Sequence, residues 1–150
     1  MTTEEKIEEI LSHIQRVQTN CYRLGLILLK NGEAELGKNL IANGQIHDNS
    51  KFKGFEFDSL FRNETLLKEA ATHHAQTNPH HPEYWGTIHL MPPLYVAEMV
   101  CDWAARSSEF GTDLRDWIEN KATKRYNFSL TSPIATSINL YTNLLLKPKF

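Results

Sequence analysis

The chain has 150 residues, of which 41% are hydrophobic and 23% are charged. These shares are close to those of globular proteins, about 45–50% and about 25%, and a chain of this length buries roughly 68–70% of its unfolded surface. We therefore expect one folded domain over residues 1–150 and exclude a disordered chain. The net charge of −2 argues against binding nucleic acid through bulk positive charge.

The sequence shows no pattern typical of a membrane protein or of a secreted protein. No apolar run approaches the roughly 18 residues that cross a bilayer, and the sequence MTTEEK at residues 1–6 is too acidic for a signal peptide. Cys21 and Cys101 fall among apolar residues and are interpreted as reduced, buried thiols. We predict a cytoplasmic protein with no membrane partner.

Apolar residues recur at the three- and four-residue spacing of helices. The first helix is expected over residues 3–30, begun by a capping box of Thr2 and Glu5 and ended by Asn31 and Gly32. Its expected buried face consists of Ile7, Ile10, Ile14, Val17, Cys21, Leu24 and Leu28.

A second helix is expected at about residues 33–46, with His47 continuing its buried face. An irregular stretch, 49–63, follows. A third helix is expected at about 64–77, because the residue before Pro79 avoids the helical region.

Segment 79–93 holds four prolines and is expected to be a structured loop. Proline in the first turn opens a fourth helix at about 93–108. Thr112 is expected to cap a fifth helix over 113–126, and Ser132-Pro133 begins a sixth. Since no strand pattern is evident, the sequence predicts an all-α fold, a bundle of about six helices.

Histidine is the unusual residue, with seven in the chain and five of them between positions 47 and 81. Imidazole and carboxylate groups are the usual ligands of divalent transition metals. Taken singly, each residue has an ordinary explanation; Asp102, for instance, could pair on the surface with Arg106, four residues on. Taken together they favour a metal site over a surface cluster without an ion. The candidate ligands, with either member of each doublet able to serve, are His13, His47, Asp48, His73, His74, His80, His81 and Asp102.

The order of these residues resembles the HD-domain superfamily of metal-dependent phosphohydrolases. A histidine, a His-Asp pair, two further histidines and a late aspartate follow one another over roughly residues 10–110. The run His47-Asp48-Asn49-Ser50-Lys51 is similar to the His-Asp-x-x-Lys form found in parts of that superfamily. The resemblance implies a helical core, one or two divalent ions (Mn, Fe, Co, Ni, Zn or Mg), and Lys51 near a substrate phosphate.

A divalent ion held by His and Asp lowers the pKa of bound water toward about 7. We therefore expect a phosphohydrolase acting on a small phosphorylated metabolite, with a nucleotide as the expected substrate. Asp48 would ligate the ion and orient the nucleophile, while Lys51 and Arg106 would bind the phosphate oxygens and neutralise their charge. Glu83 would act as a general acid or hold a ligand histidine, the alternative being an exposed loop carboxylate.

Tyr84 and Trp85 are candidates for stacking on a nucleobase, the alternative being that they pack the loop against the protein. Two other functions fit the same residues. One is an HD-type di-iron oxygenase acting on a small polar substrate. The other is a non-catalytic helical binding module with a structural metal, whose amphipathic first and last helices would pair in a homodimer.

Overall fold

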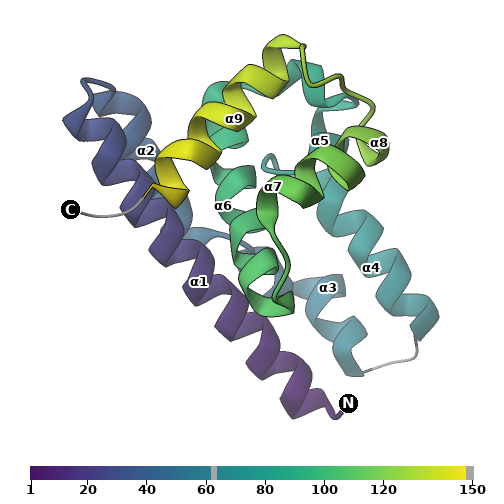
Figure 1. The fold of residues 1–150 in the computed structure, drawn as a ribbon. Helices are drawn as coiled ribbons and strands as arrows, with labels where there is room; N and C mark the ends of the chain where they lie inside the picture. The colour runs from purple at the N-terminus through teal and green to yellow at the C-terminus, as the bar shows by residue number, and fades with distance from the viewer. Residues whose placement is uncertain (62–63, 148–150) are drawn as a thin grey trace.

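The computed structural model describes residues 1–61 and 64–147, and within them the chain is helical with no strand (Figure 1). The predicted all-α fold is confirmed. The helices are α1 (Thr3–Lys30), α2 (Ala34–Ile46), α3 (Gly54–Asp58), α4 (Glu64–Thr77), α5 (Pro82–Trp85), α6 (Pro93–Phe110), α7 (Leu114–Trp117), α8 (Thr123–Arg125) and α9 (Pro133–Leu146). Shorter helical turns lie at Asn49–Phe52, Ser59–Phe61, Ile88–Leu90 and Ile118–Ala122.

Helix α1 begins with the predicted capping box. The Glu5 N–H donates to Thr2 Oγ1 over 3.1 Å, and the Thr2 N–H donates to Glu5 Oε2 over 2.9 Å. The C-terminal part of the predicted apolar face is buried, at Val17, Cys21, Leu24 and Leu28. Helix α1 therefore forms one wall of the core, as its spacing predicted.

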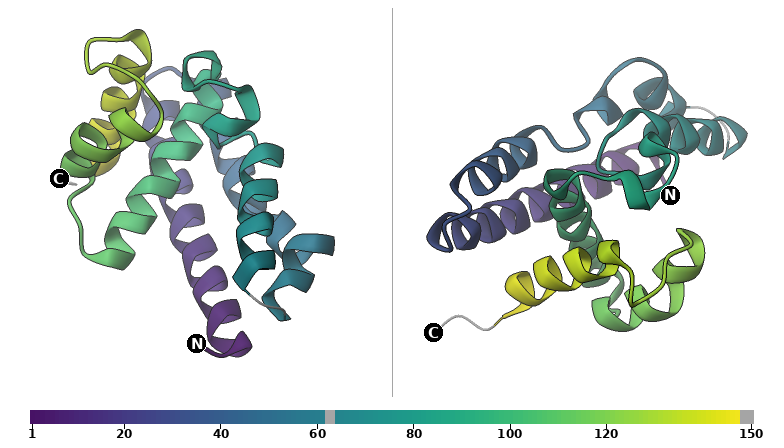
Figure 2. Two further views of the ribbon diagram at one scale, coloured as in Figure 1. Left: turned by 90° about the vertical axis from the view of Figure 1, so that its right-hand side faces the viewer. Right: turned by 90° about the horizontal axis from the view of Figure 1, so that it is seen from above.

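Helices α1 and α2 approach so closely that their backbones touch. A Cβ atom at Gly37 of α2 would lie 2.5 Å from the carbonyl oxygen of Gly25 in α1. Figure 2 shows the two helices side by side along much of their length. Near the C-terminal end of α2, which leads into His47, a Cβ atom at Gly44 would lie 2.6 Å from Cβ of Cys21, so this end also lies close against α1.

Helix α6 is central, since it contacts α1, α2 and α9 (Figure 1). It is buried over most of Val96–Ala105, including the polar residues Glu98 and Asp102. Cys21 and Cys101 are both free and buried, as predicted. The helix thus carries two buried carboxylates into the interior.

The segment after α6 differs from its prediction. Thr112 does not cap the next helix; the Asp113 side chain does, accepting from the Asp116 N–H over 3.0 Å. The predicted helix over 113–126 is divided into α7, a π-helical turn and α8. The loop over 79–93 also contains the short helix α5.

The last two residues of the predicted irregular stretch, 62 and 63, lie outside the described residues. The rest of that stretch forms α3 and two short turns. Ser132 caps α9 as expected, its Oγ accepting from the Ala135 N–H over 3.3 Å. In the described part of the chain, no helix is both long enough and apolar enough to cross a bilayer.

Candidate metal centre

Five separate segments bring polar side chains to one buried point. They are α1, the end of α2, α4, the loop before α5, and α6. Each of the side chains that meet there is at most 8% exposed. These residues are His13, His47, Asp48, His74, His80 and Asp102.

The backbone at the end of α2 turns the His-Asp pair inward. His47 is extended, with φ −55° and ψ 131°, and Asp48 is left-handed, with φ 56° and ψ 20°. Aspartate is among the few residues that tolerate this conformation. The change of direction over two residues places both side chains in the interior, as a shared ion would require.

Every buried histidine of the cluster has its Nδ1 against a glutamate carboxylate. The Nδ1–Oε distances are 2.7 Å for His13–Glu109, 2.8 Å for His47–Glu98, 2.7 Å for His74–Glu56 and 3.0 Å for His80–Glu98. A carboxylate accepts a hydrogen bond from Nδ1–H, so the neutral ring keeps its lone pair on Nε2. The glutamates therefore fix both the tautomer and the direction of each ring.

The Nε2 atoms converge on two carboxylates. Nε2 of His13 lies 2.8 Å from Asp102 Oδ1. Nε2 of His74 and Nε2 of His80 lie 2.9 Å and 3.1 Å from Asp48 Oδ1, and Nε2 of His47 lies 3.4 Å from Asp48 Oδ2. A lone pair that faces a carboxylate oxygen requires a proton or a cation between them. Ligand atoms about 2.0–2.2 Å from one ion lie roughly 3.0–3.4 Å apart, which fits this spacing.

Several of these atoms have no hydrogen-bond partner within the described residues. They are the Nε2 atoms of His13, His47, His80 and His81, and Oδ1 of Asp48. The donors fall into three overlapping groups that could hold a metal ion: Asp48 with His74, His80 and His81; His13 with His47 and Asp48; and His47 with His80 and Asp102. Asp48, His47 and His80 each belong to two of these groups, so the groups form one continuous cluster. The cluster could hold a metal, as the sequence predicted.

Burial and the close contacts within the cluster shift the pKa values of several of its groups. Burial alone would lower the pKa of His80, but the Asp48 and Glu98 carboxylates beside the ring outweigh it and raise the pKa to about 9. Burial would raise the pKa of Glu98, yet hydrogen bonds from His47 and His80 lower it to about 2. Burial and the nearby charge of His80 lower the pKa of His81 to about 3. The carboxylates stay ionised and favour a cation among them.

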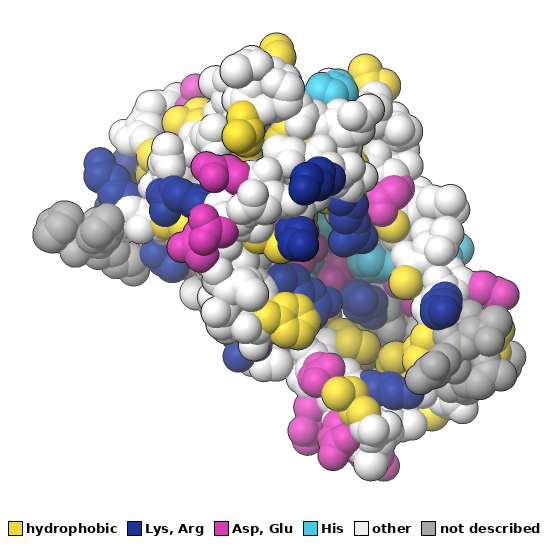
Figure 3. Space-filling model, turned by 45° about the vertical axis from the view of Figure 1, so that its right-hand side comes forward, with side chains coloured by type: hydrophobic (Ala, Val, Ile, Leu, Met, Phe, Trp, Pro, Cys, Tyr) yellow, Lys and Arg dark blue, Asp and Glu magenta, His cyan; other side chains and the backbone are white. Residues whose placement is uncertain are grey.

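A cavity of about 510 Å³ opens beside the cluster. Figure 3 shows the hollow, with acidic and histidine side chains at its base and basic side chains around it. Its cationic residues are Lys51, Arg106 and Arg125, and its aromatic wall consists of Trp103, Phe110, Trp117 and Tyr126. The Trp103 and Tyr126 rings are stacked, with centroids 5.9 Å apart and an interplanar angle of 14°.

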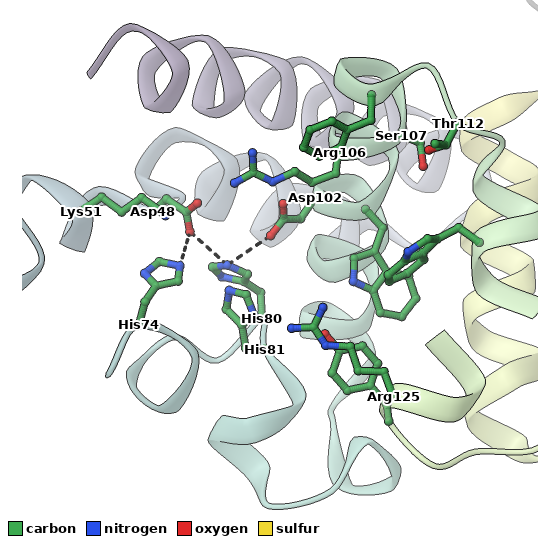
Figure 4. A pocket seen from close by; sticks show the side chains of 14 residues that line it. Asp48, Lys51, His74, His80, His81, Asp102, Arg106, Ser107, Thr112 and Arg125 are labelled. Carbon is green, nitrogen blue, oxygen red and sulfur yellow. Dashed lines mark ion pairs between the residues drawn. The ribbon is translucent and has the colours of Figure 1, made fainter. Parts of the chain in front are cut away.

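Lys51 and Arg106 both line this cavity, so the structure brings them to the metal cluster (Figure 4). The Arg106 guanidinium pairs with Glu109 Oε1 over 2.9 Å, three residues on. Asp102 instead points into the cluster and faces His13. The alternative of a surface pair between Asp102 and Arg106 was wrong, because Asp102 is buried.

Only one histidine of the first doublet, His73-His74, reaches the cluster, whereas both histidines of the second do. The His73 side chain is 50% exposed and lies 3.5 Å from Glu56, so this predicted ligand is not part of the cluster. His74, one position on, points inward from the buried face of α4. In the second doublet both rings reach the centre, with His80 buried and His81 at the cavity wall.

The predicted substrate contacts at Tyr84 and Trp85 do not lie among the residues that line the metal cavity. The Trp85 Nε1–H donates to the carbonyl of Pro79 over 2.8 Å, and its ring lies 5.8 Å from that of Tyr95. Tyr84 is exposed and lies against Trp85. These two residues pack the loop, which was the alternative explanation. Glu83 is likewise exposed and outside the cluster, since α5 directs it toward neighbouring cavities.

Four residues of the site were not predicted from the sequence: the three glutamates that orient the histidines, and Arg125. Glu98 precedes Asp102 by one turn of α6 and Glu109 follows it by two, so a shared helix face was the available signal. Glu56 lies in an irregular stretch and nothing in the sequence marks it. The same holds for Arg125, which reaches the cavity from α8.

A family model described as "Family of unknown function (DUF5662)" matches residues 56–141. No curated protein and no solved structure matches the chain. The matched segment includes His74, His80 and Asp102, whereas His13 and the His47-Asp48 pair precede it. The cluster therefore draws its ligands from inside and outside the matched segment.

Proposed function

We propose that this chain, which belongs to the DUF5662 family of unknown function, is a metal-dependent phosphohydrolase. It would cleave an ester or anhydride bond of a small phosphorylated metabolite, with a nucleotide as the expected class. One observation carries the proposal. The buried histidine–aspartate cluster lies at the base of a cavity that Lys51, Arg106 and Arg125 surround.

The donor set suits a divalent transition metal, since four imidazole Nε2 atoms and one oxygen of Asp48 meet there without hydrogen-bond partners among the described residues. A divalent ion bound there supplies a water of lowered pKa and charge for phosphate oxygens. Glu98, Glu56 and Glu109 keep the ring nitrogens aimed at the centre before any substrate arrives. Asp48, held in place by the turn after α2, would ligate the ion and orient the attacking water.

The cations and the aromatic wall would hold the substrate. Lys51 and Arg106 donate hydrogen bonds to phosphate oxygens and offset the charge that develops on them. Glu109 anchors the Arg106 guanidinium at the cavity edge. The stacked rings of Trp103 and Tyr126 exclude water and offer a flat surface for a base or a similar group.

The first test is elemental analysis of protein purified without a histidine tag, beside Asp48→Ala and the exposed control Asp58→Ala. We expect one or two transition-metal ions per chain in the wild type and in Asp58→Ala, and loss of metal in Asp48→Ala. No metal in any of the three, and none taken up on addition, would overturn the metal site and leave a helical binding module.

The second test is a panel of nucleoside mono-, di- and triphosphates and cyclic dinucleotides with Mn²⁺, Co²⁺, Ni²⁺ or Mg²⁺. We expect phosphate release or a change in chromatographic mobility for at least one compound, and none with Asp48→Ala. If the protein contains iron and consumes oxygen but cleaves none of these compounds, the di-iron oxygenase would replace this proposal.

A further inference from the structure

A second cavity of about 540 Å³ adjoins the metal centre. It lies between the N-terminal part of α1, the turn Ser59–Phe61 and α4. Much of its lining is aliphatic, from Ile10, Leu60, Leu67, Ala70, Ala71 and Ala75. Each of the two cavities has the size of an ordinary small-molecule site, about 300–1,000 Å³.

The two cavities meet at the edge of the cluster. They share Lys51, His74, His81 and Arg125, two candidate ligands and two cations. A group bound at this junction would therefore touch the metal ligands and lie between two separate chambers. One chamber has an aromatic wall, and the other has an aliphatic wall beside polar and charged residues that include Glu56 and Glu83.

Lys51 and Arg125 approach the junction from opposite sides of the cluster (Figure 4). Lys51 comes from the turn Asn49–Phe52 and Arg125 from the end of α8. Arg106 is paired with Glu109, whereas over residues 1–61 and 64–147 neither Lys51 nor Arg125 has an ion-pair partner. The Arg125 guanidinium lies over the Tyr126 ring, 5.2 Å from its centroid, and neither cation is neutralised by a carboxylate of the described residues. Two such cations lining one junction are suited to a shared anionic group.

We propose that the substrate is a phosphodiester whose phosphate lies at this junction, held between Lys51 and Arg125. This inference rests on the phosphohydrolase function proposed above. One ester substituent, a flat one, would lie along Trp103 and Tyr126, and the other in the aliphatic cavity. Water adds to phosphorus and one P–O ester bond breaks. The departing oxygen leaves as an alcohol with one proton of that water, and the other half keeps the phosphate as a monoester.

The arrangement disfavours a phosphomonoester. Such a substrate has one substituent and fills one cavity, so the second would remain filled with water. A diester gains contact area in both cavities, and that gain is available only when the phosphate lies at the junction. Arg125, which lines both cavities, is thus a specificity residue for the diester.

Two chromogenic substrates with the same leaving group test this. They are 4-nitrophenyl phosphate, a monoester, and the 4-nitrophenyl ester of thymidine 5′-phosphate, a diester. With the full chain loaded with Mn²⁺, we expect kcat/KM for the diester to be about tenfold higher or more. In calorimetry, a phosphorothioate-linked dithymidine, which is a diester analogue, should bind more tightly than thymidine 5′-phosphate, a monoester.

Variants identify which contacts cause the preference. Arg125→Ala should lower kcat/KM for the diester by about 10- to 100-fold, as expected for a lost charged hydrogen bond, while the neighbouring exposed control Lys124→Ala changes it little. Ala71→Phe, at an exposed position that lines the aliphatic cavity, should lower the diester-to-monoester ratio of kcat/KM. Ala34→Phe, exposed at the start of α2, is its control. Melting temperature and metal content show that each variant is folded and loaded.

The outcomes separate the two proposals. Equal or better cleavage of the monoester, with Ala71→Phe changing both substrates alike, would overturn the diester assignment and leave the phosphohydrolase standing. Cleavage of neither substrate, together with no activity in the nucleotide panel, would contradict the phosphohydrolase and the diester assignment together.

Discussion

The Nδ1 atom of His47 lies 2.8 Å from Oε2 of Glu98. The same carboxylate oxygen lies 3.0 Å from Nδ1 of His80, and the centroids of the two imidazole rings are 4.2 Å apart. A single glutamate on α6 therefore orients two candidate ligands that come from different segments. Asn43 donates to the other oxygen of Glu98 over 3.0 Å and holds the carboxylate in place. Glu98 is a positioning residue for the metal centre.

We expect Glu98→Gln to weaken metal binding by about 10- to 100-fold, the usual effect of losing a group that orients a ligand. The amide keeps the size of the carboxylate but loses its charge, and an NH₂ group replaces one of its two oxygens. In one orientation this NH₂ faces both Nδ1–H groups, and in the other it faces the NH₂ group of Asn43. Competition with a chromogenic chelator for Mn²⁺ or Zn²⁺ measures the affinity.

The matched control for this variant is Glu9→Gln, an exposed glutamate on α1. It removes the same charge at a distance from the ligands and should bind metal as the wild type does. If Glu98→Gln folds normally and its affinity equals that of the control, Glu98 does not position the histidines.

The stability of the metal-free protein should be greatest near pH 6.5. As pH falls, Glu98 loses its contribution between 4.5 and about 2. His81 has its pKa lowered from 6.5 to about 3, so the unfolded chain binds more protons in that range and stability falls with acidification. His80 has its pKa raised to about 9, so its contribution is complete below pH 6.5 and is lost as pH rises through 9.

Urea unfolding in the presence of a chelator, at intervals from about pH 2 to about pH 9.5, measures this profile. Saturating Mn²⁺ should abolish the alkaline decline, because the ion replaces the proton among the ligands. A metal-free protein whose unfolding free energy keeps rising up to pH 9 would show that the proton on His80 contributes no stability.

Much of the helical fold could be predicted because its signals are local. The capping box of Thr2 and Glu5 and the Ser132 cap each depend on residues within one turn, and both were found where expected. The fifth helix was predicted less well. Thr112 and Asp113 are both good capping residues, and only the path of the chain after α6 decides between them.

The residues of the candidate site also fall into those that the sequence could identify and those that it could not. Histidines and aspartates are recognised by type, so the ligands could be chosen from the sequence. Their glutamate partners could not, because His13 and Glu109 are 96 residues apart and meet only in the folded chain. His74 faces the cluster and His73 does not, because of how α4 is rotated about its axis. Neighbouring residues of a helix point about 100° apart, so the sequence alone could not decide which of the two points inward.

The backbone contact between Gly25 and Gly37 supports a prediction on stability. Gly37→Ala would place a Cβ 2.5 Å from the Gly25 carbonyl oxygen, so α2 must move away from α1. Overpacking of this kind costs about 1–3 kcal/mol, and each kcal/mol lowers the melting temperature by roughly 2–4 °C in a chain of this size. Lys38→Ala, at the exposed neighbouring position, should leave the melting temperature almost unchanged.

Because α2 leads directly into His47, the same displacement should also weaken metal binding. The measurement is the rise in melting temperature on adding Mn²⁺, which should be smaller for Gly37→Ala than for Lys38→Ala. An equal rise in both would mean that the α1–α2 contact stabilises the fold without setting the position of the ligands.

Lys51 offers the most direct separation of substrate binding from metal binding. It lines both cavities beside the ligands, and a lysine ammonium group has no lone pair to offer a metal ion. Lys51→Ala should therefore keep the metal content and melting temperature of the wild type while kcat/KM for a cleaved phosphate ester falls by about 10- to 100-fold. Lys53→Ala, two residues on and exposed, removes the same charge outside these cavities and should retain most of the activity.

The loss of kcat/KM in Lys51→Ala relative to the wild type should shrink as ionic strength rises, since salt screens part of the attraction between Lys51 and the phosphate in the wild type. Equal kcat/KM values for the two variants would remove Lys51 from the phosphate-binding site.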